Sequence, residues 1–213
     1  MGRFFVSCEE LIEFFTIPPS FEEARMIDVS FEMPIELSDQ VCGSFYSLIC
    51  ASADFTQTAS KVAFTALAAL TAGFFLGKSE FLNGWVEYAL KDTFFSLTMF
   101  LQSLRGIVDF APAHKERIRL AQENRIDSFF DQKNISSLNG QEKIAGVLLY
   151  AGRGISEISA ISAAAVQLIS CLALYFLSCE SAQSMVILGK NSYRSLVHSI
   201  AFTGACFYST YTQ

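Results

Sequence analysis

The stretch ISAISAAAVQLISCLALYFLSC, from Ile158 to Cys179, contains no charged residue, and Glu157 and Glu180 stand directly on either side of it. As an α-helix it is about 33 Å long, which is enough to cross the roughly 30 Å hydrocarbon core of a bilayer. Its strongly apolar residues each contribute about −0.3 to −0.6 kcal/mol to insertion, and its serines and Gln167 oppose them. The stretch therefore predicts either a membrane span or the central helix of a soluble bundle.

The composition of the whole chain favours the membrane. Of the 213 residues, 52% are hydrophobic and 17% are charged, whereas soluble domains carry about 25% charged residues. The mean hydropathy is +0.37. The length suits one domain, or one small domain with a membrane part. We therefore expect a mainly α fold, a helical membrane protein with two to four spans.

The N-terminal quarter of the chain is acidic. Residues 1–54 contain ten acidic residues and only Arg3 and Arg25 as basic ones, a local net charge of −8. Nucleic-acid binding needs concentrated Lys and Arg, so the sequence excludes nucleic acid as a partner. Glu9, Glu10 and Glu13 fall where a cleavable signal would need an apolar core, and no such signal is expected.

Two regions follow from these patterns. Residues 1–58 are predicted to form a short acidic N-terminal segment, in which alternating apolar and polar residues over 27–33 indicate a small strand pair. Pro34 restricts that strand to a sheet edge. Residues 59–213 are predicted to be helical and membrane-associated, with candidate spans at 62–77, 93–110, 158–179 and 195–211.

Three further segments have helical patterns. Residues 80–107 predict an amphipathic helix, with Glu87 and Lys91 paired on its polar face. Its predicted apolar face consists of Trp85, Tyr88, Ala89, Phe94, Leu97, Leu101 and Leu104. Residues 114–130 predict a polar helix, and 142–154 a short helix that ends at Gly152 and Gly154.

Small residues recur at helical spacing in two of the apolar runs. The predicted helix-packing residues are Thr65, Ala69, Gly73 and Gly77 in the first run and Ala160, Ala164 and Gln167 in the third. Small side chains let helix backbones approach closely, and an amide within a span hydrogen-bonds a neighbouring helix. The pattern predicts helix–helix association, either within the chain or with a protein partner.

The sequence offers no chemistry beyond packing. The cysteines (Cys8, Cys42, Cys50, Cys171, Cys179 and Cys206) form no metal-ligand spacing, and we expect reduced thiols, no metal and no cofactor. His114 is expected to be solvated and His198 to be a hydrogen-bonded core residue. No nucleophile, phosphate-binding or dinucleotide motif is present, so no enzymatic activity is expected. A further hypothesis is an enzyme or transport component, which would require polar groups such as Glu87, Lys91, Gln102 and Arg105 to face a cavity.

The apolar segments ISCLALYFLSCESAQ and ALKDTFFSLTMFLQSLRGIV, rich in Phe, Ser and Cys, resemble uncharacterised membrane proteins of chlamydia-like intracellular bacteria. The resemblance is one of general texture over residues 60–210. It implies a bacterial, multi-pass protein without known chemistry. Secreted inclusion-membrane proteins carry two closely spaced spans, whereas the two best runs here are about 80 residues apart.

We therefore expect an integral membrane protein with a structural or interaction role, and membrane lipid as its first partner. The distribution of Lys and Arg places both termini and residues 111–157 in the cytoplasm in a four-span arrangement. The alternative is a soluble all-helical bundle that binds a partner helix or a lipid.

Overall fold

The computed structural model describes residues 37–123, 139–178 and 184–212. Within these ranges the chain is mainly helical and has no strand, which confirms the α class. The predicted strand at 27–33 lies outside the described residues. The helices are α3 (Leu37–Phe74), α4 (Glu80–Gly106), α5 (Phe110–Glu123), α6 (Gly140–Leu177) and α7 (Ser184–Thr212).

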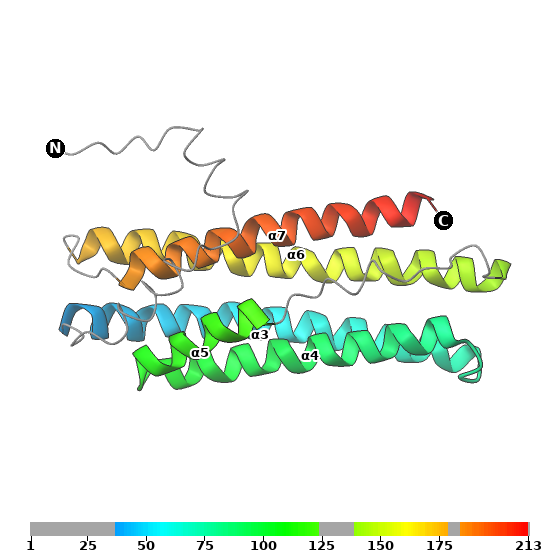
Figure 1. The fold of residues 1–213 in the computed structure, drawn as a ribbon, viewed down its shortest axis with the longest axis horizontal. Coiled ribbons are helices and arrows are strands. Elements are labelled where there is room, and N and C mark those ends of the chain that lie inside the picture. The colour runs from blue at the N-terminus through cyan, green and yellow to red at the C-terminus, as the bar shows by residue number, and fades with distance from the viewer. Residues whose placement is uncertain (1–36, 124–138, 179–183, 213) are drawn as a thin grey trace.

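Four long helices lie side by side, and the short α5 packs beside α3 and α4 (Figure 1). The hydroxyl of Ser79 donates to Glu142 Oε1 at 2.6 Å, which brings the starts of α4 and α6 together. The backbone N–H of Ser184 donates to Asp39 Oδ1 at 3.2 Å, which joins the starts of α3 and α7. Hence α3 runs antiparallel to α4 and α6, while α4 and α6 run parallel.

The helix ends follow local sequence signals. Asn139 caps α6, and Glu142 returns the hydrogen bond to the Asn139 backbone N–H, which completes a capping box. The side chain of Ser79 accepts from the Leu82 N–H at the start of α4. After α3 the backbone becomes left-handed at Leu76 (φ 54°) and Gly77 (φ 67°), and a glycine at this place is a common helix stop.

Two predicted boundaries differ from the structure. Residues 37–58, which the charge pattern assigns to the acidic segment, form the first half of α3, so the boundary at 58 falls inside a helix. The predicted helix end at Gly152 and Gly154 is wrong, because α6 continues through both. These glycines allow close packing. A Cβ at 152 would lie 2.7 Å from Leu67 Cδ2, and one at 154 would lie 3.0 Å from the Phe207 ring.

The apolar core is rich in aromatic residues. Trp85 of α4 is almost fully buried, and its ring centroid lies 4.8 Å from that of Tyr150 and 5.9 Å from that of Phe64. Both contacts are edge-on or nearly so, an arrangement that aromatic pairs prefer. A second cluster towards the other end of the bundle includes Cys50 and Cys171.

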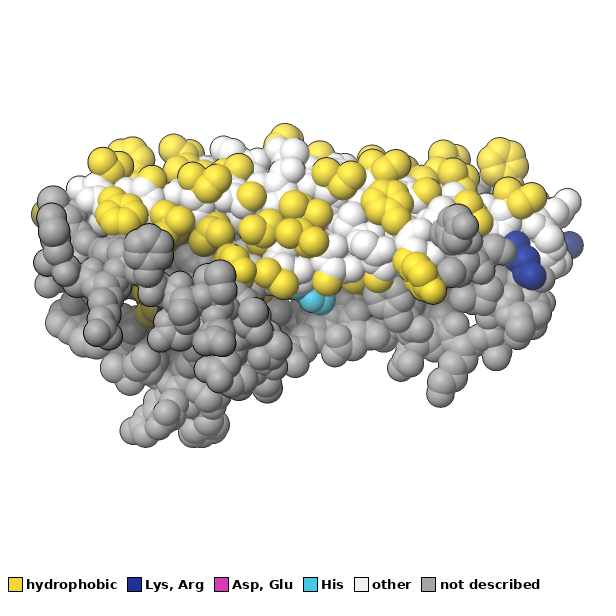
Figure 2. Space-filling model, turned by 90° about the horizontal axis from the view of Figure 1, so that it is seen from above, with side chains coloured by type: hydrophobic (Ala, Val, Ile, Leu, Met, Phe, Trp, Pro, Cys, Tyr) yellow, Lys and Arg dark blue, Asp and Glu magenta, His cyan; other side chains and the backbone are white. Residues whose placement is uncertain are grey.

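Much of the outer surface is also apolar. On α4, Trp85 and Ala89 of the predicted apolar face are buried, but Phe94, Leu97 and Leu101 of the same face are exposed. Figure 2 shows hydrophobic side chains spread over the described part of one face of the bundle, with Lys or Arg near one end. Among the described residues α6 is the one helix that is long and apolar enough to cross a membrane.

The predicted spans do not share one level along the bundle. Lys61 contacts Glu157, and α3 and α6 are antiparallel. The runs 62–77 and 158–179 therefore extend from this contact in opposite directions. Their helical parts, 62–74 and 158–177, together cover about 50 Å, well beyond the roughly 30 Å of a hydrocarbon core. In this arrangement one bilayer cannot contain the full length of both runs, because they lie at different levels along the bundle axis.

Candidate functional site

A ring of four charged side chains lies buried between α3, α4 and α6. Lys61 Nζ lies 2.9 Å from Asp92 Oδ2, and Arg153 Nη2 lies 2.5 Å from Glu157 Oε1. Lys61 also contacts Glu157, and Arg153 also contacts Asp92. Each side chain is at most 7% exposed. Each cation thus meets both carboxylates, and the ring has no net charge.

The guanidinium of Arg153 is also surrounded by aromatic rings. Its Cζ lies 5.7 Å from the ring centroid of Phe64, 5.0 Å from that of Tyr88 and 5.2 Å from that of Phe202. Ring faces attract cations more strongly where water is excluded. Arg153 therefore joins all four long helices, because these partners come from α3, α4 and α7.

Asp54 is the centre of a second buried polar cluster. Its carboxylate accepts from Ser103 Oγ at 2.6 Å, from Gln167 Nε2 at 3.0 Å and from the Arg117 guanidinium. Arg117 also donates to the Met99 carbonyl at 2.8 Å. Four helices contribute to this cluster. A buried carboxylate is tolerated when a cation and several donors satisfy it, as they do here.

The polar helix α5 supplies two buried side chains. His114 is 1% exposed, and its Nε2 lies 2.8 Å from Ser47 Oγ. Burial, together with the nearby Arg117 cation, holds the pKa of His114 well below its usual value. The Arg117 pKa is raised despite burial, because the Asp54 carboxylate stabilises the cation. The prediction that His114 is solvated is wrong, since α5 lies on the bundle.

Pairs of hydroxyl groups add further polar contacts between α3 and its neighbours α4 and α6. Thr58 and Ser96 pair at 2.9 Å and Thr65 and Thr93 at 2.8 Å, both between α3 and α4. Between α3 and α6, Ser60 Oγ donates to Ser156 Oγ at 3.4 Å. We use the name "polar seam" for the ring, the Asp54 cluster and these pairs.

Sequence reasoning missed the polar seam, although a signal is present. Ser47, Asp54 and Lys61 recur every seven residues on α3, a repeat that keeps side chains on one face of a packed helix. Asp92, Ser96 and Ser103 recur on α4 at spacings of four and seven, which also share one face. Polar residues in an amphipathic pattern predict the outer face of a helix, whereas these lie at the inner positions.

The predicted helix-packing residues divide into two groups. Ala160 and Ala164 are buried, Gln167 bonds Asp54, and Thr65 pairs with Thr93. Ala69, Gly73 and Gly77 are exposed. No heavy atom lies within 4 Å of a Cβ built on Gly73 or Gly77, leaving the backbone's own neighbours aside. The small residues of α6 therefore lie in contacts between helices, whereas most of the small residues at the end of α3 are exposed.

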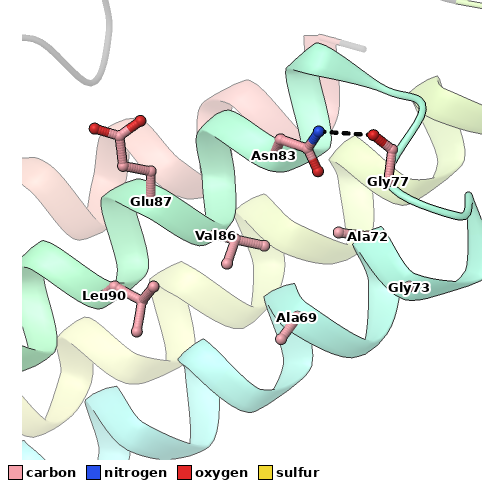
Figure 3. A pocket seen from close by; sticks show the side chains of 8 residues that line it. All are labelled: Ala69, Ala72, Gly73, Gly77, Asn83, Val86, Glu87 and Leu90. Atoms are coloured by element: carbon pink, nitrogen blue, oxygen red, sulfur yellow. Dashed lines mark hydrogen bonds between the residues drawn. The ribbon is translucent and has the colours of Figure 1, made fainter.

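A shallow surface groove of about 400 Å³ lies along this open stripe, between α3 and α4 (Figure 3). Val86 and Leu90 of α4 line it, and Asn83 Nδ2 donates to the Gly77 carbonyl at 2.8 Å. The Glu87 carboxylate points away from the α3 stripe. The groove is apolar and open, so its geometry offers no catalytic group.

The remaining candidate residues are placed separately. Glu87 and Lys91 form an exposed pair at 2.5 Å, and Arg105 pairs with Asp109 at 3.3 Å, so these residues do not face a shared cavity. His198 is exposed beside Phe202, and its predicted core position is wrong. Four cysteines are buried and unbridged: Cys42, Cys50, Cys171 and Cys206. Across the described ranges, no group of three or more His, Cys, Asp or Glu has metal-binding geometry.

Comparison of the chain with models of known protein families, with curated proteins and with solved structures finds no match. The class is therefore defined by the geometry alone. It is a helical bundle with an aromatic core, buried ion pairs and many exposed apolar side chains.

Proposed function

We propose that this chain is an integral membrane protein, held in the bilayer by α6, with a structural or interaction role and no catalytic one. The supporting observation is the surface of α6. From Ile144 to Leu177 its only charged residues are Arg153 and Glu157, and both are buried. Large side chains such as Ile169 and Phe176 are exposed along the same helix.

The charges buried on α3 and α4 agree with the same proposal. Lipid cannot solvate charge, so residues such as Lys61 and Asp92 face inwards and pair in membrane proteins. Soluble proteins rarely expose large contiguous apolar areas. The proposal is limited to α6, because among the described helices it is the one that is long and apolar enough to cross a membrane.

A second candidate is a soluble bundle whose apolar surface is covered by a partner helix or a lipid. The position of α5 favours it. Arg117 of α5 and Gln167 of α6 both contact Asp54, so α5 is level with the middle of the α6 apolar run. The charged residues Glu116 and Arg119 of α5 face outwards there. Each charge at the centre of a bilayer costs about 2.5–3.5 kcal/mol.

Alkaline extraction of membranes separates the two candidates. A protein held by α6 stays in the membrane pellet, and a soluble bundle leaves it. The variant Val166→Lys/Ile169→Lys puts two charges on the exposed face of α6 and is expected to release the protein. The control Phe45→Lys/Leu48→Lys changes two similarly exposed residues of α3 and is expected to remain in the pellet. Release of the unchanged protein overturns the proposal.

A further inference from the structure

While α6 is packed in the bundle, it cannot cross a bilayer without bringing charged residues of α5 into the bilayer. The apolar run of this helix begins after Glu157, and Gln167 lies near its middle. At that level Gln167 contacts Asp54, which in turn holds Arg117 and therefore α5. If α6 crossed a bilayer within the closed bundle, the exposed ion pair of Glu116 and Arg119 would also enter it. This conflict rests on the proposed function, because it arises only when α6 is a span.

The bundle consists of two halves that meet mainly along one line. Helices α3, α4 and α5 pack on one another, α6 packs on α7, and the main contact between the two groups is α3 with α6. Polar groups bridge this contact: Ser60 to Ser156, Lys61 to Glu157 and Gln167 to Asp54. The apolar core crosses the same boundary, since Trp85 packs on Tyr150 of α6 and the second cluster contains both Cys50 and Cys171. Separation therefore exposes apolar side chains of both halves, which lipid can cover, as well as polar groups.

Each half also balances its own buried charges. Lys61 pairs with Asp92 within the α3–α4–α5 half, and Arg153 pairs with Glu157 on α6 itself. The third buried pair, Asp54 with Arg117, lies wholly in the first half. An unpaired buried charge is the main penalty for breaking such networks. Separation of α3 from α6 leaves every one of these charged groups with an opposite charge in its own half.

We infer that the bundle opens along the α3–α6 contact when α6 enters the membrane, and that the polar-seam bonds that cross this contact hold α6 in place before insertion. The ring of four charges fixes how the two halves fit together, since each cation contacts a carboxylate from each half. The helix pairs within the first half stay together.

A disulfide across the contact tests this inference. In Ser60→Cys/Ser156→Cys the two thiols replace hydroxyls that lie 3.4 Å apart on α3 and α6. The matched control, Thr65→Cys/Thr93→Cys, joins α3 to α4 within one half, at hydroxyls 2.8 Å apart. Each full-length chain is synthesised without lipid under oxidising conditions. It is then mixed with vesicles of phosphatidylcholine and phosphatidylglycerol, which are floated and washed with alkaline carbonate.

The unchanged chain and the oxidised control are expected to float with the vesicles and to resist carbonate. The oxidised Ser60→Cys/Ser156→Cys chain is expected to remain behind and to float after reduction, with at least a tenfold change in the vesicle-bound fraction. Variants that carry only one of the two introduced cysteines cannot form the intended disulfide, so comparison with them identifies it. If the oxidised cross-contact chain floats as the control does, opening is refuted while the span survives. If the unchanged chain fails to float, the proposed span itself is refuted, and the opening with it.

Discussion

At the scale of single residues, the fold depends on buried charges whose partners come from other helices. Asp54 and Arg117 are 3% and 6% exposed, so neither charge has water as an alternative partner. A buried ion pair gains little over an apolar pair of the same volume, but loss of one partner leaves the other uncompensated. The consequences of substitution therefore depend on whether one or both members are changed.

Arg117→Met is expected to destabilise the bundle by about 3–5 kcal/mol, because it leaves the Asp54 carboxylate buried without a cation. The double variant Asp54→Leu/Arg117→Met should recover most of this loss. Arg119→Met, on the exposed side of α5, is the control and should change stability by less than about 0.5 kcal/mol. Chemical unfolding in detergent micelles measures all three. Equal losses in the single and double variants would contradict the assignment.

His114 predicts a dependence of stability on pH. Its pKa is lowered in the folded protein from an ordinary value of 6.5, so the unfolded chain binds a proton that the folded chain does not. Stability should therefore fall as pH drops below about 6.5, and should be unaffected by this residue above it. His114→Gln should reduce that decline, as measured by unfolding at a series of pH values. An unchanged slope in this variant would mean that His114 is protonated in the folded state.

At the scale of helices, what the sequence predicts depends on the kind of signal. Apolar periodicity predicts helices from residue 59 onwards, because the spacing of apolar residues is a local property of the chain, but it does not predict the first half of α3. The ends of the helices are harder to predict from the sequence. Gly152 and Gly154 are typical stop signals, yet Leu67 and Phe207 occupy the space beside them, and those contacts are distant in sequence. The buried position of Lys61 is likewise decided by Asp92 and Glu157, which local patterns do not reveal.

Two glycine substitutions separate packing from helix propensity. Gly152→Ala gains helix propensity, but its Cβ would lie 2.7 Å from Leu67 Cδ2, so we expect a net loss of about 1–3 kcal/mol. Gly73→Ala has no such neighbour within 4 Å and should stabilise the protein by about 0.5–1 kcal/mol. Thermal unfolding of the two variants measures the difference. If both stabilise equally, α6 does not pack on α3 at Gly152.

At the scale of the whole molecule, a set of charged side chains is buried beside the apolar core, and many large apolar side chains are exposed. The charged ring is buried, whereas Phe55 is 61% exposed and Phe74 84% exposed. A surface of this kind has two stable environments, a bilayer or another apolar protein surface. In plain buffer it has neither, and association between copies is the route by which it leaves water.

The purified chain is therefore expected to form large, heterogeneous assemblies in plain buffer and to become a uniform particle when mild detergent is added. The physical reason is that detergent covers the outer faces of α3 and α6 without competing for the polar seam, whose ion pairs are already satisfied within the chain. Size-exclusion chromatography with light scattering measures the particle mass in each condition. The variant Val166→Lys/Ile169→Lys should need less detergent than Phe45→Lys/Leu48→Lys, if α6 is the principal lipid-facing helix. A uniform monomer in buffer without detergent would show that water tolerates this surface, and α6 would then be a bundle helix rather than a span.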